Sequence, residues 1–209
     1  MTSSAGSPLV GGGNDGRSRR WDEHREARRT ALLGCAVEAI DASGPRLTVE
    51  TAAACADVSR TIVHRYFADR DGLGDAVAEH LRDAMLEVVD RRLDDASVPV
   101  GRERVVGAVG ACIEVLGRYP NRWLFMQQHR DGRYLIELYD EVAERAAQCL
   151  ADGTGDTDAA HRLLAQGLVG LIDFAGRAWS ASRTSPEDFA AVIGDAVRHV
   201  IDGAGAPGG

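Results

Sequence analysis

The chain has 209 residues, of which 44% are hydrophobic, and this is enough for one or two domains with a sizeable core. Its net charge of −8 argues against a protein wholly devoted to nucleic acid. The charge is uneven, however: residues 1–70 contain 10 Arg and 9 acidic residues, whereas residues 71–209 contain 14 Arg and 23 acidic residues. This asymmetry is typical of a protein that presents only one end to DNA.

Residues 1–16 are rich in Ser, Gly and Ala, and they predict a disordered tail. Apolar residues then recur every three or four positions and predict a first helix over residues 21–42. A run of arginines covers the start of this helix and the residues before it. These side chains either contact DNA phosphates or form a solvated helix face, and the sequence leaves both interpretations open. They are Arg17, Arg19, Arg20, Arg25, Arg28 and Arg29.

The segment from Thr48 to Phe67 predicts two short helices joined by a tight turn. Thr48 is placed to cap the first helix and Ser59 to cap the second. Asp57 lies in the turn, where left-handed backbone angles are needed. In the second helix Val63 and Phe67 share one face, which we expect to be buried. The other side chains of this helix can donate hydrogen bonds to phosphates or base edges. They are Arg60, Thr61, His64 and Arg65.

This segment and its flanks resemble the helix-turn-helix domain of the tetracycline-repressor (TetR) family of transcriptional regulators. The chain departs from the family pattern with Asp57 in place of Gly, His64 in place of Tyr and Arg70 in place of Lys. The resemblance implies that the second helix enters the major groove of DNA. It is based on Leu47-Thr48-Val49, Ala52-Ala53, Ala56-Asp57-Val58-Ser59, Arg65-Tyr66-Phe67 and Asp69-Arg70-Asp71-Gly72-Leu73.

The rest of the chain predicts helices throughout, and the expected fold is all-α with about nine helices. A fourth helix should begin near Asp69, run to about Asp94 and join the two domains. Further helices are predicted over residues 101–118, 120–129, 132–151, 157–182 and 186–202. With the resemblance, the expected domains are a three-helix DNA-binding domain over 17–70, a helical ligand-binding and dimerisation domain over 71–202, and a disordered tail over 203–209.

The last two predicted helices are apolar on more than one side, which favours a second packing partner. In the TetR family the two final helices of each subunit form a four-helix dimer interface, and the resemblance implies the same arrangement here. A deep core within a single subunit is the alternative. The candidate interface residues are Leu164, Leu168, Leu171, Ile172, Phe189, Val192, Ile193, Val197 and Val200.

The middle of the chain holds most of the remaining aromatic residues, and the resemblance implies a pocket for a small molecule among them. Each of these residues could equally belong to an ordinary core. The pocket candidates are His80, Met85, Cys112, Trp123, Met126, His129, Tyr134, Tyr139 and Phe174.

Catalytic and metal-binding motifs are absent from the sequence. It contains no G-x-S-x-G motif, no phosphate-binding glycine loop and no H-E-x-x-H motif, so we expect no enzyme activity and no cofactor. The histidines lack ligand spacing, so no metal site is expected. Cys35, Cys55, Cys112 and Cys149 are scattered in apolar contexts and predict buried thiols. The sequence has neither a signal peptide nor an apolar run of ~20 residues, which predicts a cytoplasmic protein without a membrane partner.

These features predict a DNA-binding transcriptional regulator that responds to a ligand. We expect a homodimeric repressor, bound to double-stranded operator DNA and released by a small, largely apolar effector. The alternative is a small-molecule-binding or enzymatic helical protein whose helix-turn-helix no longer binds DNA, an interpretation suggested by Asp57 and His64. The predicted DNA contacts are Thr48, Ser59, Arg60, Thr61, His64, Arg65, Tyr66 and Arg70.

Overall fold

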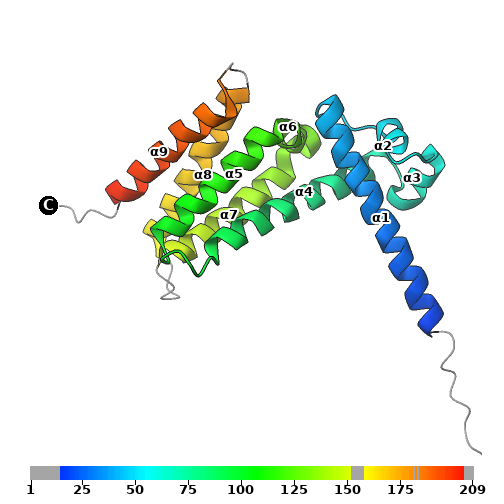
Figure 1. Cartoon of the computed structure of the whole chain (residues 1–209), viewed down its shortest axis with the longest axis horizontal. Coiled ribbons are helices and arrows are strands. Elements are labelled where there is room, and N and C mark those ends of the chain that lie inside the picture. The colour runs from blue at the N-terminus through cyan, green and yellow to red at the C-terminus, as the bar shows by residue number, and fades with distance from the viewer. Residues whose placement is uncertain (1–14, 152–157, 181, 183, 205–209) are drawn as a thin grey trace, which may run out of the picture.

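The structure is a computed structural model that describes residues 15–151, 158–180, 182 and 184–204. Within these residues the chain forms nine α-helices, one short 3-10 helix and no strand (Figure 1), so the all-α prediction is confirmed. In chain order the helices are α1 (Asp15–Ser43), α2 (Val49–Cys55), α3 (Arg60–Phe67), α4 (Arg70–Leu93), α5 (Arg102–Arg118), α6 (Pro120–Gln128), η1 (His129–Gly132), α7 (Arg133–Leu150), α8 (Ala159–Ser180) and α9 (Pro186–Ala204).

The predicted helix boundaries agree with the observed ones to within a few residues, except at the first helix. That helix begins at Asp15 instead of Trp21, and its first turns project away from the other helices (Figure 1). Residues 15–20 contain no apolar residue, so no helical stripe marks these turns in the sequence. The predicted tails fall largely on residues 1–14 and 205–209, which lie outside the described residues.

Helices α1, α2 and α3 form the N-terminal domain around an apolar core. Ile40 of α1 and Val63 of α3 are each 1% exposed, and Phe67 at the end of α3 is also buried, as its spacing predicted. Ala52 and Ala53 of α2 are buried in the same core. Their small side chains let α2 lie close to its neighbours.

Helix α4 joins the N-terminal domain to the rest of the protein. Its apolar residues between Leu73 and Leu86 belong to a core shared with α1, α2, α3, α6 and α7. Val89 and Leu93, farther along α4, belong to a second core among α5, α7, α8 and α9. Because one helix takes part in both cores, a shift of α4 in the second domain would also move the N-terminal domain.

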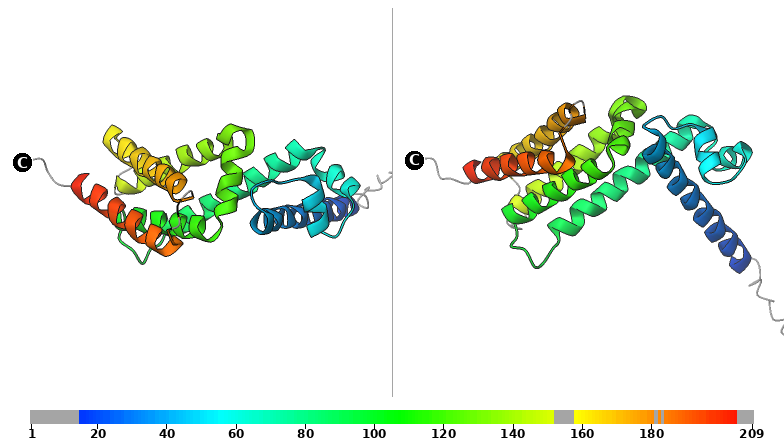
Figure 2. Two further views of the ribbon diagram at one scale, coloured as in Figure 1. Left: turned by 90° about the horizontal axis from the view of Figure 1, so that it is seen from above. Right: turned by 45° about the horizontal axis from the view of Figure 1, so that its top comes forward.

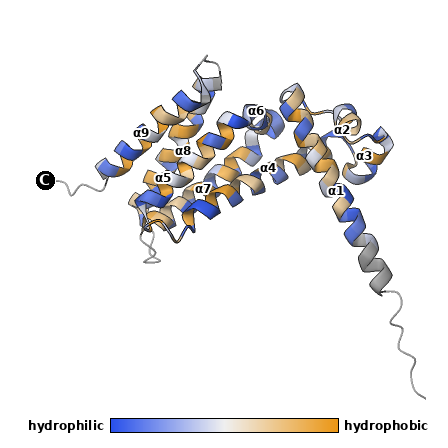
Figure 3. Ribbon diagram, viewed as in Figure 1, coloured by the Kyte–Doolittle hydropathy of each residue, from blue (hydrophilic) through white to orange (hydrophobic). Residues whose placement is uncertain are grey.

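The second domain consists of the later turns of α4 and of the helices from α5 to α9. Helix α5 packs against α4 and α9, while α7 packs against α4 and α8. Figure 2 shows α8 and α9 at the end of the molecule farthest from α1–α3, and Figure 3 shows hydrophobic and hydrophilic residues alternating along α4, α5 and α7. Between α6 and α7 the chain turns through left-handed backbone at Arg130 and Asp131. Of the helices described, none has the length and apolarity to cross a lipid bilayer.

Candidate DNA-binding surface and effector cavity

The exposed face of α3 presents a group of hydrogen-bond donors. Arg60, Thr61, His64 and Arg65 are all exposed, while the opposite face of α3 packs into the core. Asp57 has a φ of 49°, so it makes the predicted left-handed turn between α2 and α3. Arginine and histidine donate to phosphates and to the guanine edge in the major groove, and threonine can contact either. This face of α3 therefore has the chemistry of a recognition helix.

The two predicted caps differ in what their hydroxyls do. Thr48 caps α2, because its Oγ1 accepts from the backbone N of Thr51 at 3.1 Å while the Oγ1 of Thr51 accepts from the backbone N of Thr48 at 3.2 Å. Thr48 is therefore the cap that the sequence predicted for α2. Ser59 precedes α3 in an extended conformation, but its hydroxyl makes no capping hydrogen bond, so that part of the prediction is wrong. The exposed Ser59 hydroxyl is left to bind a phosphate.

Arg60 and His64 both have partners in the protein without DNA. Arg60 Nη1 lies 3.1 Å from Glu50 Oε1 at the start of α2, and both side chains are more than half exposed. Solvent screens such an exposed pair and it contributes little to stability, so a phosphate can replace Glu50. His64 Nδ1 lies 2.9 Å from the carbonyl oxygen of Ala68, to which it donates. His64 Nε2 is then a donor only when the ring is protonated.

Arg70 and Tyr66 lie at the edge of this surface. Arg70 is exposed, and its Nε donates to the carbonyl of Leu47 at 3.3 Å, which ties α4 to the segment before α2. A guanidinium has five N–H donors, so this bond leaves capacity for a phosphate. Tyr66 is half-buried, with its ring beside that of Phe67 at a centroid distance of 6.4 Å.

The arginine run on α1 is only partly described. Arg25 and Arg28 are exposed, whereas Arg29 lies over the Phe67 ring at 5.4 Å and pairs with Glu26 at 3.8 Å. The side chains of Arg17, Arg19 and Arg20 lie outside the described residues.

A cavity of about 310 Å³ lies between α4, α5, α6 and α7, at the lower end of the usual range for small-molecule pockets. Most of its wall is apolar, with Glu87, Arg91 and Arg122 as its charged residues. Three predicted residues line it, namely Met85, Trp123 and Met126. The other lining residues were not predicted from the sequence, and they are Leu81, Ala84, Glu87, Val88, Arg91, Val115, Leu116, Tyr119, Arg122, Leu135 and Leu138.

The other six predicted pocket residues lie elsewhere, because helical spacing does not say which side of a helix meets a cavity. His80 is exposed on α4, and Phe174 is 74% exposed on α8. Cys112 lines a separate cavity of about 30 Å³ in the second core, where burial raises the pKa of its thiol to about 12. His129 and Tyr134 stack on each other with ring centroids 5.9 Å apart, outside the cavity.

Tyr139 acts on the cavity through Trp123. The indole Nε1 of Trp123 donates to Tyr139 Oη at 3.2 Å, and Tyr139 Oη donates to Asp173 Oδ1 at 2.6 Å. Burial and the hydrogen bond to Asp173 raise the pKa of Tyr139 above its usual range, so the phenol stays protonated. These two bonds fix the orientation of an aromatic ring in the cavity wall.

A charged pair connects the cavity wall directly to the N-terminal domain. Arg122 of α6 donates from Nε to Asp41 Oδ1 at 2.9 Å and from Nη2 to Asp41 Oδ2 at 2.6 Å. The Arg122 guanidinium also lies 3.7 Å from the centroid of the Tyr119 ring. Asn121 Nδ2 donates to the backbone carbonyl of Asp41 at 3.2 Å. Because Asp41 lies near the end of α1, these contacts join α6 to the N-terminal domain.

A second polar contact joins η1 to the start of α4. His129 Nε2 lies 2.8 Å from Asp75 Oδ1, and the guanidinium of Arg130 donates to both oxygens of Asp75 at 3.0 and 3.1 Å. The hydrogen bond from Arg130 is the main cause that lowers the pKa of Asp75 to about 2. A Cβ on Gly74 would lie only 2.5 Å from His129 Cε1, so glycine is needed for this close approach.

The outer faces of α8 and α9 expose large apolar side chains that range from 45% to 74% exposed. Around the positions where Gly167 and Gly170 would bear a Cβ, no heavy atom lies within 4 Å, so another helix can approach α8 closely. We call these residues the α8–α9 outer face. Its apolar side chains are Leu163, Phe174, Val192 and Val200.

The predicted dimer-interface residues divide between the α8–α9 outer face and the second core. Val192 and Val200 are exposed, as an interface requires. Leu164, Leu171 and Ile172 are partly buried against the core of their own subunit. Four of the candidates are buried in the core of their own subunit: Leu168, Phe189, Ile193 and Val197.

The prediction of four scattered, buried thiols is also wrong. Cys55 is exposed, and the other three cysteines are only partly buried. Cys35 of α1 and Cys55 of α2 come together with Glu38, so that one sulfur or carboxylate oxygen from each lies within 4.8 Å of the others. The cysteines are too far apart in the sequence for a spacing motif, and only the packing of α1 on α2 brings them together.

Comparison with known proteins identifies regulators with related sequences. The HTH-type transcriptional regulator BetI of Burkholderia mallei is 38% identical over 155 residues, which cover 71% of this chain and 80% of BetI. An uncharacterized HTH-type transcriptional regulator of Mycobacterium tuberculosis is 41% identical over 70 residues. That match covers 34% of this chain but only 30% of the relative's length. No family model matches the sequence.

Solved structures share the fold. A putative TetR-family transcriptional regulator from Rhodococcus sp. has a TM-score of 0.63 and 22% identity, and the match covers 84% of this chain and 99% of that one. A shared fold at this identity does not establish a family. The 38% sequence identity with BetI, a TetR-family regulator, does establish it. With the donor-bearing α3 on the surface of its helix-turn-helix, the chain belongs to the TetR family of DNA-binding transcriptional regulators, which are not enzymes.

Proposed function

We propose that the chain is a homodimeric repressor that leaves its operator when a small, largely apolar molecule enters the cavity beside Trp123. The observation that supports this proposal best is the bidentate pair between Arg122, in the cavity wall, and Asp41, in the N-terminal domain. A regulator that responds to a ligand needs a physical connection between its two sites, and this pair supplies one.

DNA recognition would use the α3 helices of two subunits, inserted in successive major grooves about 34 Å apart. Arg60, Thr61, His64 and Arg65 are the candidates for base edges and nearby phosphates. Ser59, Tyr66 and Arg70 would contact the phosphates at the edge of this surface, whereas Thr48 would act as the cap of α2.

The second copy of the chain would cover the α8–α9 outer face. Exposed Leu, Phe and Val side chains next to unobstructed glycines are suited to close helix packing in an interface with two-fold symmetry. The spacing of the two N-terminal domains would then depend on the position of each α4. This dependence is how a change at the cavity would alter DNA affinity.

An effector with an apolar body and one hydrogen-bond acceptor would match the cavity. The apolar part would lie against Met85, Trp123 and Met126. An acceptor group would compete with Asp41 for Arg122, since a guanidinium binds carboxylates and similar groups bidentately. Release of Asp41 would free α1 from α6. By linkage, DNA would weaken effector binding by the same factor.

The substitution Arg65→Ala tests DNA recognition. Binding to DNA fragments from upstream of its own gene would be measured by fluorescence anisotropy at several salt concentrations. A loss of about 1–3 kcal/mol of binding free energy per subunit, hence twice that in a dimer, predicts a DNA affinity lower by about 30-fold to 20,000-fold. A phosphate contact would also reduce the salt slope by about 1 per subunit, whereas a base contact would leave it unchanged.

The matched control is Arg92→Ala, which removes an exposed arginine from α4 in the second domain. It should leave both affinity and salt slope as they are. If Arg65→Ala binds as tightly as the unmodified chain, or if no fragment shows sequence preference, the helix-turn-helix does not recognise DNA. The alternative of a helical protein with a degenerate helix-turn-helix would then be favoured.

A further inference from the structure

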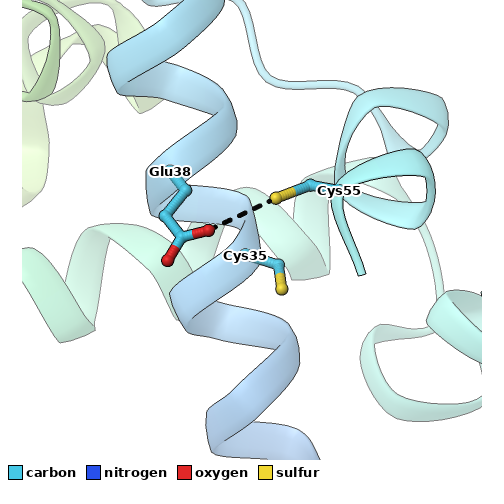
Figure 4. A group of neighbouring side chains, drawn as sticks. All are labelled: Cys35, Glu38 and Cys55. Atoms are coloured by element: carbon cyan, nitrogen blue, oxygen red, sulfur yellow. Dashed lines mark hydrogen bonds between the residues drawn. The ribbon is translucent and has the colours of Figure 1, made fainter. Parts of the chain in front are cut away.

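Three potential metal ligands converge on the surface of the N-terminal domain (Figure 4). Cys35 and Glu38 are three residues apart on α1 and therefore lie on the same side of that helix. Cys55 is the last residue of α2. Its Sγ lies 3.6 Å from Glu38 Oε2, and the Sγ of Cys35 lies within 4.8 Å of both atoms.

These separations match a tetrahedral zinc ion. With Zn–S bonds of about 2.3 Å and a Zn–O bond of about 2.1 Å, a tetrahedral angle places sulfur and oxygen about 3.6 Å apart and two sulfurs about 3.8 Å apart. The Cys55–Glu38 distance already has this value. The remaining pairs need to close by no more than about 1 Å, which side-chain rotation can supply.

The carboxylate of Glu38 is available to a cation. Among the ion pairs of the described residues, none includes Glu38. A bound metal ion would stabilise both thiolates and release protons.

We propose that Cys35, Glu38 and Cys55 bind one borderline-soft divalent cation, for which Zn²⁺ is the best match, with water in the fourth position. Two thiolates select zinc over magnesium or calcium. Exposure of Glu38 and Cys55 leaves the ion open to solvent and exchangeable. The ion would hold the end of α2 against α1, next to the turn that orients α3. This site is independent of the cavity and of whether the chain binds DNA.

The test is a metal titration of the purified, reduced, full-length chain after chelation. Co²⁺ serves as the spectroscopic probe, because thiolate ligands give it a charge-transfer band and tetrahedral geometry gives intense visible bands. Zn²⁺ then displaces Co²⁺ and yields the zinc affinity. We expect one ion per chain. Zinc affinity should fall by at least about 100-fold in Cys35→Ser and in Cys55→Ser. Substitution of residues that only orient metal ligands already lowers metal affinity by about 10–100-fold, so loss of a ligand should cost at least as much.

Two further variants and a stability measurement complete the test. Glu38→Gln should lose about tenfold in affinity or more, and the control Cys149→Ser, whose thiol lies away from the cluster and donates to Gly101, should lose nothing. Zn²⁺ should raise the Tm of the unmodified chain and of Cys149→Ser, but not that of folded Cys35→Ser/Cys55→Ser.

Three results would overturn the proposal. The first is unchanged zinc affinity in the Cys35→Ser/Cys55→Ser variant. The second is a Co²⁺ spectrum without thiolate charge transfer. The third is mass spectrometry that finds Cys35 and Cys55 joined as a disulfide in the chain purified under reducing conditions, because those sulfurs could not then bind an ion.

Discussion

The pair between Arg122 and Asp41 gives the sharpest prediction about communication between the two domains. Asp41→Asn keeps the shape of the side chain but removes its charge. The two side chains are 29% and 26% exposed, so solvent screens part of a charge-assisted interaction worth about 1.5–3 kcal/mol. We expect a loss of about 1–2 kcal/mol in the free energy of unfolding. For a chain of this size the Tm should fall by about 2–8 °C.

DNA affinity should fall as well, because Asp41 holds α1 against the cavity wall. If the whole free energy of the pair stabilises the orientation that binds DNA, its loss raises the Kd for DNA by about 5-fold to 30-fold. Differential scanning calorimetry measures the fall in Tm, and fluorescence anisotropy on upstream DNA measures the fall in DNA affinity. The double variant Asp41→Asn/Arg122→Gln should lose no more unfolding free energy than the more destabilised of the two single variants. Both substitutions remove the same interaction, so their effects should not add.

The matched control is Asp202→Asn, which breaks a pair with Arg102 at 2.8 Å between α5 and α9. Both of these side chains are more exposed, and neither belongs to the N-terminal domain. Its Tm should change by no more than about 2 °C and its DNA affinity should stay the same. The reasoning would be refuted if Asp41→Asn lowered the Tm while its DNA affinity stayed within twofold of the unmodified chain.

Three further predictions concern acid stability, assembly and the cavity. Hydrogen bonds from Arg130 and then His129 lower the pKa of Asp75 from 3.8 to about 2, so its stabilisation is present above 3.8 and is lost as pH falls through about 2. When the free energy of unfolding is measured against pH, Asp75→Asn should remove about 1–2 kcal/mol of this acid-dependent loss, which is less than the pKa shift alone implies because the group is partly exposed. An unchanged loss of stability in acid would contradict the assignment to Asp75. Phe174→Glu puts a charge on the α8–α9 outer face of both subunits and should give a single-subunit mass by light scattering, whereas a dimeric mass would exclude this face as the interface. Trp123→Ala should enlarge the cavity and cost about 3–5 kcal/mol in urea unfolding, and a loss below about 1 kcal/mol would mean that the indole is not packed.

The fold could be predicted from the sequence because its signals are local. Helical periodicity, Ser-Gly-Pro and Tyr-Pro-Asn breaks and the capping residue Thr48 predicted every α-helix from α2 to α9, and Asp57 predicted the turn that orients α3. The exposed donors of α3 followed from the same periodicity, since Val63 and Phe67 indicated which face is buried. The start of α1 was missed because residues 15–20 contain no apolar residue that could form a helical stripe.

The sites that involve several helices could not be predicted in the same way. Periodicity shows that a helix has an apolar side, but α8 and α9 have two, and only packing decides that Leu168 and Val197 face inward while Phe174 and Val192 face outward. Cavity walls depend on how four helices meet, so Arg122 gave no signal in the sequence.

The helices, the turn of the helix-turn-helix and the exposed, donor-bearing side of α3 could all be derived from the sequence, because each depends on residues within a few turns of one another. Tertiary structure alone decided the cavity, the Arg122–Asp41 connection and the meeting of Cys35 with Cys55. These features join residues from different helices, and their positions follow from the packing of whole cores rather than from any local preference of the chain.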